Sequence, residues 1–201
     1  MYYIFFGIIV FATFAMTVQH GVWSNLITLI AVLLGGITAF GVHQPLTVMA
    51  DEATGGSYTY LLDFPILWGM FALTAGLVKE FAQMLSRNRV NFPDQLDGLL
   101  GAGIGLVTAL ILGGFAMATF HCAPFAYDQM GGAFEHGDKV AEVKSSLESS
   151  SSPDVFWLSA VDTALNPSAL GAAGFRSDLW VHQHGQHRKT FQNMQESIVK
   201  R

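Results

Sequence analysis

The chain has 201 residues, of which 51% are hydrophobic and only 12% are charged, and its formal net charge is −5. An ordinary soluble domain carries about twice that charged fraction, so the composition favours a membrane protein. The net charge is negative and the basic residues form no continuous stripe, so the sequence gives no electrostatic support for nucleic-acid binding.

Four apolar segments have the length of membrane-crossing helices, for which about 20 residues suffice. They cover about residues 2–18, 26–42, 61–78 and 99–120. None alternates as a barrel strand does, and lipid offers the backbone no hydrogen-bond partners, so we expect four transmembrane helices. Residues 1–120 are therefore predicted to form an all-α integral membrane domain.

The charged residues indicate where this domain ends and how it is oriented. Residues 1–120 hold three basic and six acidic side chains, whereas residues 121–201 hold seven and nine. The three basic ones, Lys79, Arg87 and Arg89, all lie in the connection 79–95. The positive-inside rule places that connection in the cytoplasm. With four spans, the amino terminus, the second connection and the C-terminal tail then face the opposite side of the membrane.

Small residues recur at helical spacing in two of the predicted spans. Such faces let helix backbones approach closely. We favour packing within one subunit, because the spacing is frequent in unrelated membrane helices; a seam between copies in a homo-oligomer is the alternative. The residues concerned are Gly35, Ala39, Gly101, Gly105, Ala109 and Gly113.

Three carboxylates lie near predicted membrane boundaries. Asp63 is about one turn inside the third span, where we expect a solvated or helix-capping role in preference to the functional role that an acid deep in a span would indicate. Asp94 and Asp97 lie just before the last predicted span, at the start of its helix, where the helix dipole favours acids.

Two short motifs carry a family resemblance. A polar turn ending in His20-Gly21 follows the first span, and Asp94 and Gly98 open the glycine-rich last one as Asp-x-x-x-Gly. Over about residues 1–120 this arrangement resembles the CvpA family, the colicin V production proteins, whose turn ends in Arg-Gly. The resemblance implies an inner-membrane protein linked to toxin production or export and to envelope function, and supplies no molecular mechanism.

Residues 121–201 are predicted to form a polar, partly disordered extramembrane tail. Within it, apolar residues at helical spacing predict an amphipathic helix at 154–165. His182, His184 and His187 form an H-x-H-x-x-H run, a pattern that suits Zn²⁺ or Ni²⁺. No cysteine and no acid closer than Asp178 completes a site, so we expect a solvated tail, no metal and no cofactor.

These patterns favour a non-enzymatic membrane protein of the CvpA type. Its partners would be the lipid bilayer and a second copy or another membrane protein. The alternative is a small transporter or channel subunit, motivated by the boundary carboxylates. A membrane enzyme is disfavoured, because the chain has no Ser/His/Asp grouping, no HExxH and no phosphate-binding loop.

Overall fold

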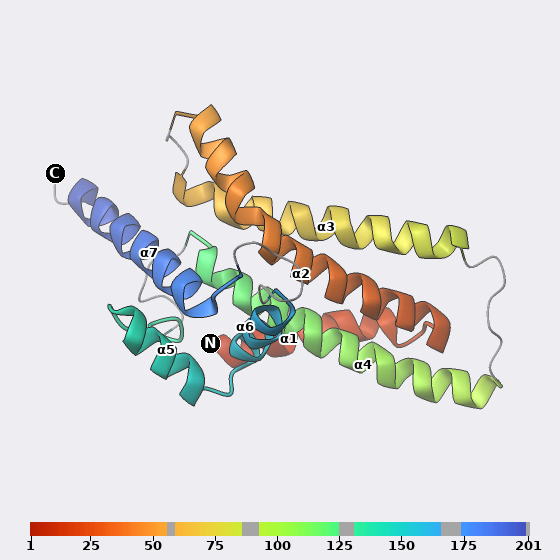
Figure 1. The fold of residues 1–201 in the computed structure, drawn as a ribbon. Helices are drawn as coiled ribbons and strands as arrows, with labels where there is room; N and C mark the ends of the chain where they lie inside the picture. Colours follow the sequence, from red (N-terminus) through yellow and green to blue (C-terminus); the bar gives the residue numbers. More distant parts are fainter. Residues whose placement is uncertain (56–58, 86–92, 125–130, 166–173, 200–201) are drawn as a thin grey trace.

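The structure is a computed structural model that describes all residues except 56–58, 86–92, 125–130, 166–173 and 200–201. The described residues form helices and no strand. Figure 1 shows the helices of the N-terminal half running along one another in a long bundle, with the helices of the C-terminal tail gathered towards one end. The helices are α1 (Tyr2–Thr17), α2 (Val22–Ala53), α3 (Thr59–Leu85), α4 (Asp94–Thr119), the 3-10 turn η1 (Phe120–Cys122), α5 (Val140–Ser149), α6 (Pro153–Ala164) and α7 (Ser177–Val199).

Three segments are long and apolar enough to cross a membrane. They are Val22–Ala53, Leu61–Leu85 and Leu96–Cys122. α1 is apolar but has only 16 residues, or about 24 Å of helix against a hydrocarbon core of about 30 Å. The structure is therefore compatible with a multi-pass membrane protein, and the fourth predicted span remains a prediction.

α2 extends far beyond the predicted second span. It continues through Pro45 to Ala53, so much of the predicted connection 43–60 is helical. A proline inside a helix removes one backbone hydrogen bond and usually bends or ends the helix, which is why the sequence favoured a loop. Packing offsets that loss, because α2 runs along α3 and buries His43 and Thr47 of the extension.

The tail is folded over the residues that the structure describes. α6 lies against α4, while α7 packs against α5 and η1. Trp157 of α6 and Trp180 of α7 are 2% and 1% exposed and share one buried cluster with Phe40 and Phe115 of the bundle. The predicted partial disorder is therefore not confirmed. In the sequence, the apolar residues of the tail alternate with polar and charged ones, which suggested disorder. In the structure they pack together against the surface of the bundle.

The two ends of the bundle carry different segments (Figure 1). The N-terminus, the end of α2, the start of α3, the end of α4 and the tail helices lie at one end, here called the tail end. The turn between α1 and α2, the end of α3 and the start of α4 lie at the other, here called the turn end.

Candidate functional site

Ionisable side chains are buried where the tail helices meet the bundle. Most of them come from segments far apart in the chain, so only the docked tail brings them together. Burial of such groups is rare unless they are paired or hydrogen-bonded. The buried set comprises His43, Asp63, His121, Asp154, His184 and Arg188.

Asp154 links the tail to the bundle. It lies in the first turn of α6, where the helix dipole favours an acid. His121 of η1 donates from Nε2 to Asp154 Oδ2 over 2.9 Å, and the Tyr2 hydroxyl of α1 donates to Oδ1. Burial alone would raise the pKa of the Asp154 carboxyl, but the hydrogen bonds that it accepts, that of His121 first, outweigh burial and hold that pKa well below its usual range. Asp154 is therefore an ionised, buried carboxylate.

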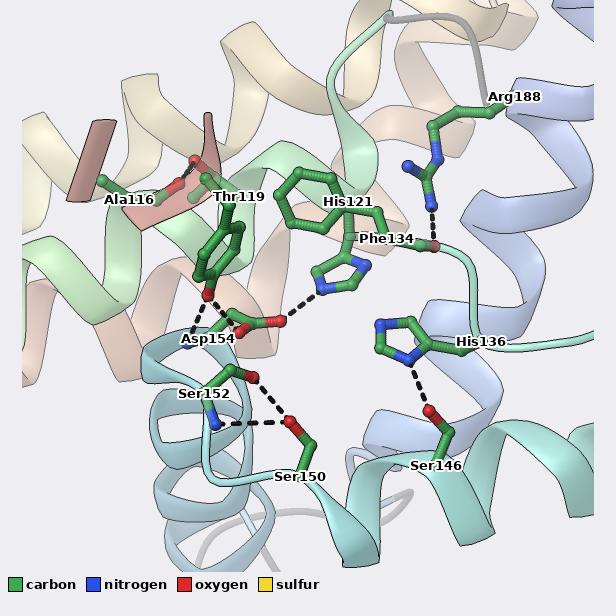
Figure 2. Close-up of polar contacts among 11 residues, drawn as sticks. Ala116, Thr119, His121, Phe134, His136, Ser146, Ser150, Ser152, Asp154 and Arg188 are labelled. Carbon is green, nitrogen blue, oxygen red and sulfur yellow. Dashed lines mark hydrogen bonds and ion pairs between the residues drawn. The ribbon is translucent and has the colours of Figure 1, made fainter. Parts of the chain in front are cut away.

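His136 faces this group from the segment before α5 (Figure 2). Its ring centroid lies 5.3 Å from that of His121, and its Nδ1 lies 2.9 Å from the Ser146 hydroxyl. Burial lowers the pKa of His136 to about 4, and the neighbouring His121 acts in the same direction. The imidazole is thus neutral at pH 7. One possible metal-ligand atom from each of His121, His136 and Asp154 lies within 4.8 Å of the other two.

A second polar group surrounds Asp63 of α3, which is 7% exposed. Its Oδ2 lies 3.4 Å from His184 Nε2 and 3.9 Å from His187 Nδ1, both on α7. The expected solvated role of Asp63 is therefore wrong. Sequence spacing placed this acid near a boundary, but α7 covers that boundary.

Hydrogen bonding fixes the protonation of His43. The Trp180 indole, which can only donate, lies 3.0 Å from His43 Nε2. His43 Nε2 therefore accepts, and its Nδ1 carries the proton towards the carbonyl oxygens of Ala39 and Phe40, 3.2 Å and 3.1 Å away. A buried, neutral imidazole thus joins α2 to α7.

His184 is fixed between α7 and α3. Its Nδ1 lies 2.8 Å from the carbonyl oxygen of Trp180, which only accepts, so Nδ1 donates. Its Nε2 is then the atom that faces the Asp63 carboxylate, at 3.4 Å.

At the turn end, the structure brings the two family-like segments together. The backbone N–H of Val22, next to Gly21, donates to Asp97 Oδ1 over 2.9 Å. A β-carbon on Gly101 would lie 2.7 Å from the His20 carbonyl oxygen. Buried Asn25 donates from Nδ2 to the carbonyl oxygen of Gly101 over 2.7 Å. Glycine at position 101 thus allows the turn to lie directly on α4.

The other residues that the sequence singled out are dispersed. A β-carbon on Gly98 would meet no atom within 4 Å, and the side chain of Asp94 lies outside the described residues. Lys79 is exposed towards the turn end of α3, whereas Arg87 and Arg89 lie outside the described residues.

The small-residue positions face neighbouring segments of the same chain. A β-carbon on Gly35 would lie 2.9 Å from that of Ala75 in α3, and one on Gly105 would lie 2.9 Å from the Thr17 hydroxyl. A β-carbon on Gly113 would approach α1 to 2.8 Å. Ala39 and Ala109 are fully buried.

The H-x-H-x-x-H run does not converge on one point. His182 Nε2 lies 2.9 Å from the carbonyl oxygen of Asp138, whereas His184 and His187 face Asp63. The solvated tail predicted for this run is wrong, because His184 is buried.

The group formed by His121, His136 and Asp154 was not anticipated from the sequence. The available signals were a histidine directly after an apolar span and an acid opening an amphipathic helix. Neither signal is specific, because each residue type is common at such a boundary.

Comparison of this chain with protein-family models, curated proteins and solved structures finds no match. Fold and site together define an all-helical protein, over the described residues, with three helices able to cross a membrane and a helical tail. Buried histidines and carboxylates join that tail to the bundle.

Proposed function

We propose that this chain is a non-enzymatic, multi-pass inner-membrane protein of the CvpA type that acts in toxin production or export and in envelope function. Its three long apolar helices support membrane insertion. Its tail, held on one end of the bundle, gives it an ordered extramembrane surface for partner proteins.

The contact between the turn after α1 and the start of α4 is the observation that carries this proposal. The resemblance rests on His20-Gly21 and on the segment from Asp94 to Gly98. These segments are more than seventy residues apart, yet Asp97 caps α2 at Val22. Two motifs that are matched independently and then pack together are more readily explained by a shared architecture than by chance.

The same arrangement supports the proposed orientation. Lys79 is exposed towards the turn end of α3, and the N-terminus and tail lie at the opposite end. A cytoplasmic turn end satisfies the positive-inside rule and places the tail on the non-cytoplasmic side. Reporter fusions at Glu52, at Arg87 and at the C-terminus test this placement. Arg87 should report the cytoplasm and the other two the opposite side.

The functional test is complementation of a colicin V-producing strain that lacks its own family member. The chain should restore the zone of growth inhibition, and Gly101→Leu, which pushes the turn off α4, should not. Both proteins are quantified in the membrane fraction. Restoration by the strain's own family member is the positive control. If that control succeeds while the chain, present at equal membrane levels, restores nothing, the proposal fails.

The Asp63 group favours a second candidate, a proton-coupled transporter subunit. An ionisable group inside a span is a default marker of a proton or ion pathway. Here Asp63 lies 3.4 Å from His184 Nε2, while His43 and His187 lie beside the pair. Proteoliposomes with a trapped pH-sensitive dye test it. Proton flux should be lost in Asp63→Asn and retained in Asp97→Asn, a carboxylate at the turn end. Flux that is absent from the wild type, or unchanged by Asp63→Asn, excludes this candidate.

A further inference from the structure

Two ring nitrogens in the group around Asp154 have no hydrogen-bond partner among the described residues. They are Nδ1 of His121 and Nε2 of His136, and both atoms are buried. The His121 side chain is fully buried. An unpartnered buried polar atom is destabilising, and native structures contain few of them. His136 Nε2 also faces the contact between His121 Nε2 and Asp154, which indicates that a ligand completes this group.

The other nitrogen of each ring is held by the protein. His121 Nε2 donates to Asp154, and His136 Nδ1 faces the Ser146 hydroxyl. The lone pair of His136 Nε2 is therefore free, whereas His121 faces Asp154 with Nε2 and turns Nδ1 away from it. His136 is held as metal-binding histidines are, with one ring nitrogen fixed by a hydrogen bond and the second left for the ion. Figure 2 shows Nε2 of His136 turned towards the contact between His121 Nε2 and the Asp154 carboxylate.

We propose that Nε2 of His121, Nε2 of His136 and the Asp154 carboxylate bind a divalent transition-metal ion, with zinc best matched by two imidazoles and one carboxylate. A fourth position remains for water or another small ligand. The inference does not rest on the proposed membrane function.

The charges around the group are compatible with such an ion. The low pKa of His136 leaves its ring neutral, and Asp154 is ionised. The one proton that an ion displaces is that on His121 Nε2, which moves to the unpartnered Nδ1 of the same ring. Arg188 opposes the cation, but its guanidinium is engaged by the carbonyl oxygen of Phe134 at 3.1 Å and lies 5.7 Å from the Phe134 ring centroid. The expected affinity is therefore lower than that of a site without a nearby arginine.

Binding requires a small contraction. Ligand atoms around tetrahedral zinc lie about 3.3 Å apart, given metal–ligand bonds of about 2.0–2.2 Å, whereas these donors lie within 4.8 Å. His136 is the member free to move, because it is only partly buried and precedes Gly137, whose φ of 101° favours glycine and marks a turn. His121 and Asp154 are fixed by the core.

The test is titration of the full-length, detergent-solubilised, chelator-treated chain with Co²⁺, whose visible absorption reports coordination, followed by displacement with Zn²⁺. One equivalent should bind. His136→Ala should weaken binding by at least tenfold, and Asp154→Asn should do so by a similar factor. His182→Ala is the matched control, since it removes a histidine of α7 outside the group and should leave the affinity unchanged. Metal-free melting temperatures show that the variants fold.

Three results would overturn the proposal. The first is no saturable binding, in which case water bridges the two nitrogens. The second is binding that His136→Ala does not weaken. The third is binding that only His182→Ala weakens, which would assign the ion to the histidine run of α7.

Discussion

Replacing Gly36 by alanine tests the contact that joins α6 of the tail to α2 of the bundle. A β-carbon at this position would lie 2.4 Å and 2.6 Å from two ring atoms of Trp157 and 3.3 Å from Phe115. Trp157 is 2% exposed, so its ring cannot move aside without displacing its neighbours. The substitution should therefore loosen the docked tail.

The magnitude follows from two opposing effects. Overpacking a filled core costs about 1–3 kcal/mol, while replacing a helical glycine by alanine returns up to about 1 kcal/mol. The expected net loss is about 1–2 kcal/mol, or roughly 3–6 °C in melting temperature for a chain of this size. Gly76→Ala is the matched control, because no atom lies within 4 Å of its β-carbon position. That variant should melt at or above the wild-type temperature.

Thermal unfolding in detergent, followed by tryptophan fluorescence, measures the difference. Limited proteolysis provides a second reading, since a loosened tail should be cleaved faster in Gly36→Ala than in Gly76→Ala. If Gly36→Ala melts with or above the wild type and its tail resists protease equally well, the described packing of α6 on α2 is wrong.

Three further predictions concern the polar contacts. Asn25→Ala should destabilise the chain by about 1–3 kcal/mol, because three backbone carbonyls of the turn end lose their buried donor. Asp97→Ala should cost about 1 kcal/mol by removing the acceptor for the N–H of Val22, with Asp97→Asn intermediate or neutral. Between pH 4 and about 6.5 the unfolded chain protonates His136 while the folded chain, with its pKa of about 4, does not, so stability should rise with pH by up to about 3 kcal/mol. His136→Gln, measured with chelator present, should flatten that rise.

Each outcome is read from melting curves in one detergent. An unchanged melting temperature for Asn25→Ala would show that the turn is not anchored as described. Equal losses for Asp97→Ala and Asp97→Asn would point to charge instead of hydrogen bonding. A pH profile that His136→Gln leaves unchanged would assign the titration to another group.

The sequence predicted the helices well where hydropathy alone decides them. An apolar run of span length forms a helix in lipid whatever its neighbours are, so α2, α3 and α4 were anticipated. It failed at the second half of α2, because the local signal of Pro45 was overridden by packing along α3. In the tail, the structure has α6 (Pro153–Ala164) where the sequence predicted an amphipathic helix at 154–165. The sequence did not predict that the tail packs on the bundle, because its buried residues acquire their partner only when α6 and α7 meet the bundle.

The sequence did not predict most of the candidate site, because its residues meet only when the tail packs on the bundle. Asp63 was recognised as an acid inside a span, but its partner His184 lies more than a hundred residues later, in a segment that looked solvated. His121, His136 and Asp154 come from three separate segments, and their spacing matches no local metal motif. Only the docking of the tail defines this group.

That docking is most directly tested by the reactivity of Cys122, the single cysteine of the chain. Its side chain is 5% exposed, its thiol faces the Thr119 carbonyl oxygen, and it shares a core cluster with Trp180 and Val181 of α7. The measurement is the rate at which a small water-soluble maleimide labels the native chain in detergent, compared with the denatured chain and with Trp180→Ala. A docked tail predicts strong protection in the native chain, faster labelling in Trp180→Ala and full labelling after denaturation. Labelling of the native chain at the denatured rate would contradict the account.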